Sequence, residues 1–247
     1  MSTRPEYAVE VKDVAKTFGR LRALDGISLR IRRGEVYGLL GPNGSGKTTL
    51  IRCLVGLVQP NTGTVTVLGR RIPDLGVLAR VGYMTQVAAL YPDLSVEENL
   101  RFFAAINGAE ANVDEALKFV ELSDRRKSIV ATLSGGMRTR ASMACALIHH
   151  PDLLLLDEPT VGVDPQLRVQ LWDRFQAMAA EGITIVVSSH VMDEADRCQR
   201  LGLIRFGKLL AEGSPQELRR MARVDRLEDA FLKLSATSAA GSGEGGP

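Results

Sequence analysis

The sequence is poor in cysteine, has no long apolar run and carries almost no excess of either charge. Its 247 residues include only three cysteines, Cys53, Cys145 and Cys198. Because no two of them form a CxxC pair, a zinc site and a disulfide framework are disfavoured, and reduced thiols are expected. No segment approaches the roughly 18 consecutive apolar residues that span a bilayer, and the first residues, MSTRPEYAVEV, lack the apolar core of a signal peptide. If the protein acts at a membrane, another chain is expected to supply the span.

The charge balance argues against one large class of partner. Lys+Arg number 31 and Asp+Glu 29, which leaves a formal net charge of +2. Proteins that bind nucleic acid usually carry a strong basic excess, so no nucleic-acid partner is expected. The hydrophobic content of 45% is ample for a buried core, and the chain is predicted to be globular.

Alternation of apolar and polar residues predicts strands in the first third of the chain. The segments YAVEVKDV and GTVTVLG alternate, and ISLRIRRGEVYGLLG contains two more runs, broken at Arg33-Gly34. Two later runs, DLLLLDEP and ITIVVSSH, are continuously apolar over the length of a strand, which is typical of strands buried on both faces of a parallel sheet. Between them, PQLRVQLWDRFQAMAAEG predicts a crossover helix that ends at Gly182, and so a β-α-β unit.

Helices are predicted for the middle of the chain. Ser95 and Glu98 in SVEENLRFFAAING form a capping-box pattern, which predicts a helix that ends near Gly108. The segments NVDEALKFVEL and SGGMRTRASMACALIHHP predict two more helices, the second capped by a serine and stopped before Pro151. Residues 235–247 are small and polar, so a disordered tail is expected there.

A glycine-rich segment, GLLGPNGSGKTTLIRCL, holds the first candidate site. It matches the pattern G-x-x-x-x-G-K-[ST], with a strand-like run before it and a helix-like run after it. Glycines let backbone N–H groups surround phosphate oxygens, the helix N-terminus adds partial positive charge, and the lysine adds a full one. The pattern therefore predicts a phosphate-binding loop formed by Gly41, Pro42, Asn43, Gly44, Ser45, Gly46, Lys47, Thr48 and Thr49.

A phosphate-binding loop requires an acidic residue at the end of a buried strand, and LLLLDE supplies two. Asp157 is predicted to hold Mg²⁺ together with the hydroxyl of Thr48. Glu158 is placed to polarise a water aimed at the terminal phosphate. Thr49 is expected to donate to another phosphate. The alternative for the acidic pair is a solvated strand end or a helix cap.

Between these two motifs lies LSGGM, residues 133–137, and here the chain resembles the nucleotide-binding subunit of an ABC transporter. The remaining motifs appear in that family's order: Gln86 in YMTQ resembles the Q-loop, Asp164 in VGVDP the D-loop, and His190 in VVSSH the switch histidine. The resemblance runs from about Tyr7 to Leu234. It implies an α/β P-loop NTPase fold with a RecA-like parallel core sheet and an N-terminal antiparallel β-subdomain. It also implies an α-helical subdomain, about 92–150, inserted in the domain 1–234.

The resemblance also implies ATP as the ligand of the glycine loop, and an ATPase in which two such domains meet head to tail. The signature of one copy, here Ser134, Gly135, Gly136 and Met137, would cap the γ-phosphate held by the glycine loop of the other. A serine and two N–H groups at a helix N-terminus suit that role, because they form an anion site with no phosphate of its own. Asp164 would lie at the interface.

Further roles follow from the same family pattern. Glu158, His190 and Gln86 would be catalytic, with His190 on the γ-phosphate. Gln86 would also sense Mg²⁺, so that Thr48, Gln86 and Asp157 form the metal set. Phe18, in KTFG, would stack on adenine; a phenylalanine buried in the core is the alternative.

The resemblance implies a transmembrane permease partner and a peripheral location at the cytoplasmic face of the cell membrane. Leu90, Tyr91 and Pro92 lie where the family forms the groove for that partner, although packing beneath the helical subdomain would also explain them. Three details of the sequence resemble those of subunits of bacterial exporters of drugs, antibiotics, polysaccharides or lipids. They are Met137 in place of glutamine and the segments TVGVDP and LEDAFLKL. Thr139 and Val163 depart from the family pattern, but neither removes a catalytic group.

The alternative function is a soluble ABC-type ATPase that acts as an assembly or clamp module without transport. The sequence has no long heptads, no second glycine loop and no basic stripe, which disfavours the common forms of such modules. A kinase or GTPase is disfavoured by the signature and by the lack of an Asn-Lys-x-Asp pattern.

Overall fold

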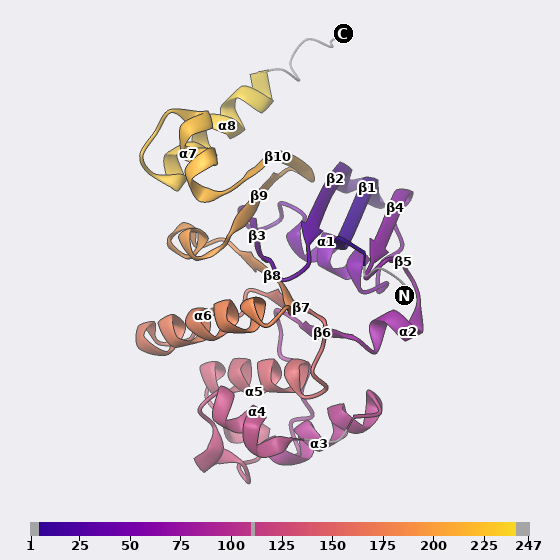
Figure 1. Ribbon diagram of the computed structural model, residues 1–247, viewed down its shortest axis with the longest axis vertical. Coiled ribbons are helices and arrows are strands. Elements are labelled where there is room, and N and C mark those ends of the chain that lie inside the picture. Colours follow the sequence, from indigo (N-terminus) through magenta and orange to yellow (C-terminus); the bar gives the residue numbers. More distant parts are fainter. Residues whose placement is uncertain (1–4, 110–111, 241–247) are drawn as a thin grey trace.

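The computed structural model describes residues 5–109 and 112–240 and contains an antiparallel sheet and a larger core sheet (Figure 1). Ile27, Leu29 and Ile31 of one antiparallel strand are buried and alternate with exposed residues, as the sequence predicts. They form one cluster with apolar residues of helix α1 (Lys47–Leu54) and of the core sheet, so α1 is packed between the two sheets. The antiparallel order is β2-β1-β4-β5, with β1 at Tyr7–Phe18, β2 at Leu21–Arg32, β4 at Thr62–Val67 and β5 at Arg70–Arg71.

The core sheet has the strand order β10-β9-β3-β8-β7-β6, and all its pairings are parallel except that of β10 with β9. Every residue of β3 (Val36–Leu40), β7 (Leu153–Asp157) and β8 (Thr184–Ser189) is buried. This confirms the prediction of a parallel sheet whose strands are covered on both faces. The other three strands are β6 (Val81–Met84), β9 (Arg200–Arg205) and β10 (Lys208–Gly213).

Parallel pairing brings the carboxyl ends of three buried strands to one edge. In the register of the sheet Leu40 of β3 lies beside Ser189 of β8, and Ser188 lies beside Asp157 of β7. The glycine loop starts directly after Leu40, and Glu158 directly follows Asp157. The two sequence motifs, which are more than a hundred residues apart, are therefore joined through β8.

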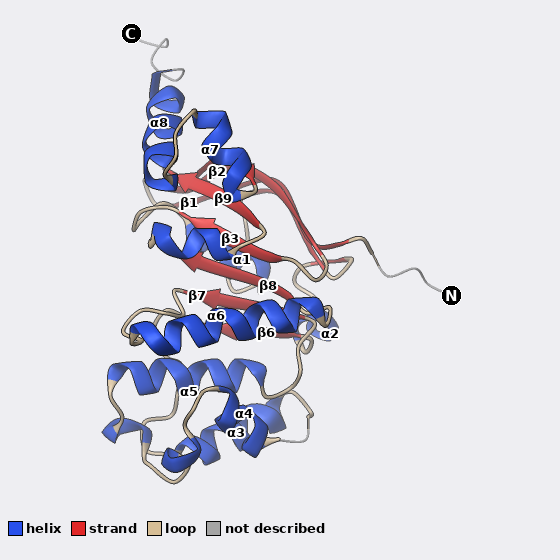
Figure 2. Ribbon diagram, turned by 60° about the vertical axis from the view of Figure 1, so that its left-hand side comes forward, coloured by secondary structure: helices blue, strands red, loops and turns tan. Residues whose placement is uncertain are grey.

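The segment between β6 and β7 is helical and forms a separate layer beside α6 (Pro165–Ala180), as Figure 2 shows. The first long helix of this segment, α3 (Val96–Ile106), has the predicted capping box: Glu98 N donates to Ser95 Oγ at 3.2 Å, and Ser95 N donates to Glu98 Oε2 at 2.7 Å. The predicted crossover helix corresponds to α6. The helical elements of the segment are α3 (Val96–Ile106), α4 (Val113–Phe119), the 3-10 turns Ser123–Arg125 and Val130–Thr132, and α5 (Gly135–Leu147); a short helix, α2 (Leu75–Leu78), precedes β6.

The C-terminal part forms a helical pair at the opposite end of the molecule, α7 (Pro215–Ala222) and α8 (Leu227–Ala240) (Figure 2). The prediction of a disordered tail from residue 235 is wrong for residues 235–240, which belong to α8. Ser235 is 2% exposed and follows the buried Phe231 by one helical turn, so tertiary packing extends a helix through a small, polar segment. Residues 241–247 lie outside the described part. Within that part, no helix is long and apolar enough to cross a membrane.

The helical layer approaches the core sheet closely at Gly82 of β6. A Cβ atom at this position would lie 2.1 Å from the carbonyl oxygen of Ala146 in α5 and 2.9 Å from Leu154 Cδ1. Because the Ala146 oxygen belongs to the backbone, a change of side-chain rotamer could not relieve this clash. Gly82 thus sets how closely α5 approaches the sheet.

This contact predicts a large stability difference between two glycine substitutions. Gly82→Ala should lower the free energy of unfolding by about 1–3 kcal/mol, because overpacking forces backbone shifts. Gly76→Ala in α2 is the matched control: its Cβ would meet only the Asp74 side chain, at 3.3 Å. Urea unfolding of both variants checks this. Equal stabilities would contradict the close approach of α5 and β6.

Candidate functional site

The glycine loop connects β3 to α1 and has no room for side chains at two of its glycines. A Cβ at Gly41 would lie 2.1 Å from the carbonyl oxygen of Ile204, and one at Gly46 would lie 2.6 Å from that of Ala23. Gly46 also has a φ of 110° and directly precedes α1, where only glycine adopts such a backbone without strain. The loop is therefore shaped by its glycines, with the N-terminus of α1 at its end, as a phosphate-binding loop requires.

Lys47 is folded back over the loop. Its Nζ donates to the carbonyl oxygens of Gly41 at 2.7 Å and Pro42 at 3.1 Å, and it lies 3.9 Å from Glu158 Oε1. Burial lowers the pKa of the Lys47 ammonium from its ordinary value, while the carboxylates of Glu158 and Asp157 oppose that shift. A cation so placed is available to an anion that enters the loop.

Asp157 is fully buried at the end of β7 and uses only one of its carboxylate oxygens. Ser188 Oγ donates to Oδ1 at 2.5 Å, whereas Oδ2 is buried and has no hydrogen-bond partner among the described residues. A buried carboxylate oxygen without a partner is costly, which suits an oxygen that receives a cation. The alternative of a solvated strand end is therefore wrong for Asp157.

The three predicted catalytic residues lie together, because Gln86 and His190 both contact Glu158. The side chain of Glu158 is 8% exposed; Gln86 Nε2 donates to its Oε2 at 3.3 Å, and His190 Nδ1 lies 3.2 Å from its Oε1. Gln86 follows β6 and His190 follows β8, so the edge of the core sheet assembles the group from three strands. Glu158 itself has a φ of 55°, a left-handed conformation that points to a constrained site.

The loop borders an open cavity of about 360 Å³. Thr48 and Thr49 line it, as do Gln86 and Glu158, so predicted phosphate-binding residues and two of the predicted catalytic residues face the same space, whereas Asp157 and His190 are not among the lining residues. The complete lining is Leu21, Ala23, Asn43, Gly44, Ser45, Gly46, Lys47, Thr48, Thr49, Gln86 and Glu158. None of these residues comes from the helical segment 92–150.

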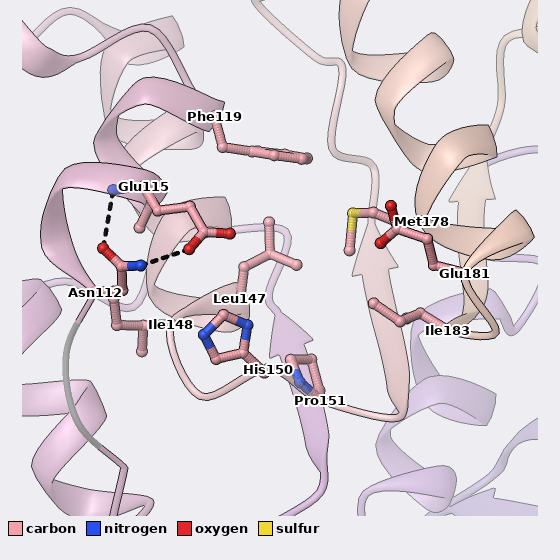
Figure 3. Close-up of a pocket in the computed structure, with 11 residues that line it drawn as sticks. Asn112, Glu115, Phe119, Leu147, Ile148, His150, Pro151, Met178, Glu181 and Ile183 are labelled. Atoms are coloured by element: carbon pink, nitrogen blue, oxygen red, sulfur yellow. Dashed lines mark hydrogen bonds between the residues drawn. The ribbon is translucent and has the colours of Figure 1, made fainter.

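A second cavity, of about 130 Å³, lies between α4, the end of α5 and the end of α6, and Figure 3 shows Phe119, Leu147, Met178 and Ile183 around it. No lysine or arginine is among its lining residues, and the side chains of Glu115 and Glu181 contribute negative charge. Carboxylates and apolar side chains do not attract phosphates, so this cavity is not a second nucleotide site.

Phe18 is 46% exposed at the end of β1, so the alternative of a core phenylalanine is wrong. Lys16 Nζ lies 5.1 Å from the centre of its ring. Phe18 pairs with Leu21, which lines the cavity beside the glycine loop, although Phe18 itself is not among the lining residues. Stacking of Phe18 on adenine stays a prediction.

The signature residues lie at the start of α5, apart from the glycine-loop cavity. Ser134 caps α5 by accepting a hydrogen bond from Met137 N at 3.3 Å. Asp164 caps α6 in the same way, accepting from Leu167 N at 3.0 Å. A Cβ at Gly136 would lie 2.5 Å from the carbonyl oxygen of Gly162, so the signature packs directly on the loop that leads to Asp164.

Four residues near the site, Ser188, Ser189, Glu194 and Arg168, were missed by the sequence analysis. Ser188 contacts both Asp157 and Glu158. The buried Glu194 accepts from Ser189 Oγ at 3.1 Å and lies 3.6 Å from Arg168 Nε. No local pattern marks Ser188 or Arg168, because their partners are distant in the sequence and are brought close only by the sheet and by α6.

A strand, glycine loop and helix with a buried lysine, next to an acidic strand end in a parallel sheet, define a P-loop nucleoside triphosphatase. Within that class, the family model described as ABC transporter matches residues 24–161, and the chain belongs to this family. The predicted α/β P-loop fold with an antiparallel subdomain is confirmed.

Two relatives and two solved structures illustrate the similarity. The chain is 39% identical over 244 residues to a probable multidrug ABC transporter ATP-binding protein of Escherichia coli, covering 94% of this chain but only 42% of that protein. It is 42% identical over 222 residues to a Nod factor export ATP-binding protein of Paraburkholderia xenovorans, covering 87% of this chain and 73% of the relative.

The first of the structures is an ATP-binding subunit of an ABC transporter, with a TM-score of 0.85 at 28% identity, covering 92% of this chain and 99% of the other. The second is a dimeric ATP-binding cassette in a post-hydrolysis state bound to ADP and Pi, with a TM-score of 0.78 at 26% identity, covering 83% and 98%.

The packing of the signature predicts different effects for its two glycines. Gly136→Ala should destabilise the protein by about 1–3 kcal/mol, because the added Cβ meets the Gly162 carbonyl. Gly135→Ala should have little effect, because nothing lies within 4 Å of its Cβ. Thermal unfolding without nucleotide measures both. A stable Gly136→Ala variant would show that α5 does not rest on the Gly162 loop.

Proposed function

We propose that this chain is the ATP-hydrolysing motor subunit of an ABC transporter, and that the transporter is an exporter. The observation that carries the proposal is that Gln86 and His190 both contact Glu158, and that Glu158 and Gln86 line the cavity of the glycine loop. Family membership supports it, and so do the relatives, which are named for multidrug transport and Nod factor export.

In this proposal the glycine loop and Lys47 bind the β- and γ-phosphates of ATP, and Phe18 stacks on the base. Glu158 orients a water molecule and accepts its proton as the water oxygen bonds to the γ-phosphorus and the bond from that phosphorus to the bridging oxygen breaks. The products are ADP and phosphate. The contacts of Glu158 with Gln86 and His190 hold the carboxylate towards the cavity, and His190 is available to the γ-phosphate.

The residues present fit Mg²⁺. The buried, unpartnered Asp157 Oδ2 and the hydroxyl of Thr48 are hard oxygen donors, which Mg²⁺ prefers, and Gln86 offers a third. When bound, Mg²⁺ would neutralise the charge that develops on the phosphates. Thr48, Asp157 and Gln86 therefore form the proposed metal set.

The site is completed by a second ATPase subunit in this proposal. Ser134, Gly135, Gly136 and Met137 present a helix N-terminus but do not line the cavity of their own chain. A head-to-tail dimer would bring them to the γ-phosphate in the other copy, with Asp164 at the interface. The dimeric cassette to which this chain is similar supports this arrangement.

A transmembrane permease is the second proposed partner, and it would hold the protein at the cytoplasmic face of the membrane. Leu90 is partly buried against the core, as the packing alternative requires, but Tyr91 is 47% exposed and meets Phe102 edge to face at 4.6 Å. Buried Asn99 fixes Tyr91 by bonding both its N–H and its carbonyl oxygen. Tyr91 and Phe102 thus offer an exposed aromatic surface a few residues after Gln86 in the chain, which suits the permease.

Substitution of Glu158 tests the catalytic role. Glu158→Gln keeps the shape of the side chain and removes the proton acceptor, so it should bind ATP normally but hydrolyse it roughly 100-fold or more slowly. Lys47→Ala is the contrasting variant, in which nucleotide binding itself should weaken. Steady-state hydrolysis and equilibrium binding of ATP separate the two effects. Unchanged turnover in Glu158→Gln would remove Glu158 from its proposed role.

Substitution of Ser134 tests the shared site. Ser134→Arg should leave ATP binding intact, because Ser134 does not line the cavity of its own chain, but the bulky side chain should block closure and abolish hydrolysis. Ser123→Arg places the same residue on another exposed turn of the helical segment and should stay active. Normal hydrolysis by Ser134→Arg would contradict the shared-site arrangement.

A further inference from the structure

Ser188 is the only hydroxyl in the described chain that contacts both acidic residues of the candidate site. It is fully buried as the penultimate residue of β8, the strand between β3 and β7. Its Oγ donates to Asp157 Oδ1 at 2.5 Å and accepts from Glu158 N at 3.1 Å. The carbonyl oxygen of Ser188 also accepts from Glu158 N, at 3.2 Å. One residue thus fixes the end of the neighbouring strand at two successive positions.

The first contact determines which oxygen of Asp157 is free. A serine hydroxyl has one proton, and this proton is directed to Oδ1. A hydroxyl that donates to a carboxylate forms one of the stronger kinds of hydrogen bond in proteins, because the acceptor is charged. Rotation of the carboxylate would break this bond, so Oδ2 is held as the oxygen without a partner.

The second contact holds the backbone of Glu158. With a φ of 55°, Glu158 adopts the left-handed conformation, which is unfavourable for residues other than glycine. Its N–H is shared between the hydroxyl and the carbonyl oxygen of Ser188. This backbone orientation carries the Glu158 side chain towards Gln86 and His190.

We propose that Ser188 is a positioning residue that orients Asp157 towards the metal and Glu158 towards the water, although Ser188 itself is fully buried and does not line the cavity. The inference rests on the proposed function, because it assumes that Asp157 holds Mg²⁺ beside the phosphates of ATP. Outer-shell partners of metal-binding carboxylates commonly have this effect, and their loss weakens metal affinity by about 10–100-fold.

The neighbouring Ser189 provides a built-in control. Its Oγ donates to Glu194 at 3.1 Å and accepts from Val191 N at 3.0 Å, and neither acid of the site is its partner. Ser189 is also buried on the same strand. Ser189→Ala therefore removes a buried hydroxyl next to Ser188 without removing a contact of Asp157.

Three substitutions of Ser188 separate the hydroxyl from its volume. Ser188→Thr retains a hydroxyl and adds a methyl group. Ser188→Val has nearly the same shape as the threonine variant but no hydroxyl. Ser188→Ala removes the hydroxyl without adding bulk. Binding of the slowly hydrolysed analogue AMP-PNP is measured for each variant in EDTA and in MgCl₂. The ratio of the two dissociation constants reports how strongly Mg²⁺ supports binding, and thermal unfolding reports stability.

We expect the affinity in EDTA to stay close to that of the unsubstituted protein in every variant. The gain in affinity from MgCl₂ should fall about 10-fold or more in Ser188→Ala and Ser188→Val, and should persist in Ser188→Thr and Ser189→Ala. A purely structural role would lower the unfolding temperature and leave this gain unchanged. Ser188→Ala and Ser188→Val with the full gain would therefore overturn the inference, as would equal losses in Ser188→Thr and Ser188→Val. If the unsubstituted protein itself gains nothing from MgCl₂, the proposed function fails as well.

Discussion

The common edge formed by the ends of β3, β8 and β7 is the constraint on which the rest of the site depends. Pairing of Leu40 with Ser189, and of Ser188 with Asp157, places the glycine loop, the two acids and His190 within one hydrogen-bonded framework. The framework is rigid because every residue of these three strands is buried. Neighbouring residues at this edge have different surroundings: Asp157 is fully buried at the end of β7, whereas Glu158 lines the cavity.

The described part of the helical layer contributes no residue to the lining of the glycine-loop cavity. The signature begins α5, and α5 is set against the sheet at Gly82 and against the Gly162 loop at Gly136. These close approaches tie the signature to the segment that carries Asp164. In the proposed dimer, the signature and Asp164 of one chain would therefore meet the other chain together, so closure would be a movement of one packed unit.

Local patterns predicted most of the fold. Continuously apolar strands, the Ser95–Glu98 capping box and the glycine loop each specify their structure within a few residues, and the structure confirms them. Long-range packing explains the errors. Burial of Ser235 extends α8 into a segment whose composition indicated disorder, and exposure of Phe18 excludes the core alternative. The role of Ser188 was not predictable from the sequence, because a serine in a strand acquires its partners only through the register with β7.

The central claim, that each active site is built from two chains, is tested most directly by mixing two inactive variants. Lys47→Ala lacks a working glycine loop but keeps its signature, whereas Ser134→Arg has the reverse defect. A mixed dimer contains one site with both parts intact, so the account predicts that the mixture hydrolyses ATP at a rate well above the sum of the two separate samples. A mixture no more active than that sum would contradict a site shared between two chains.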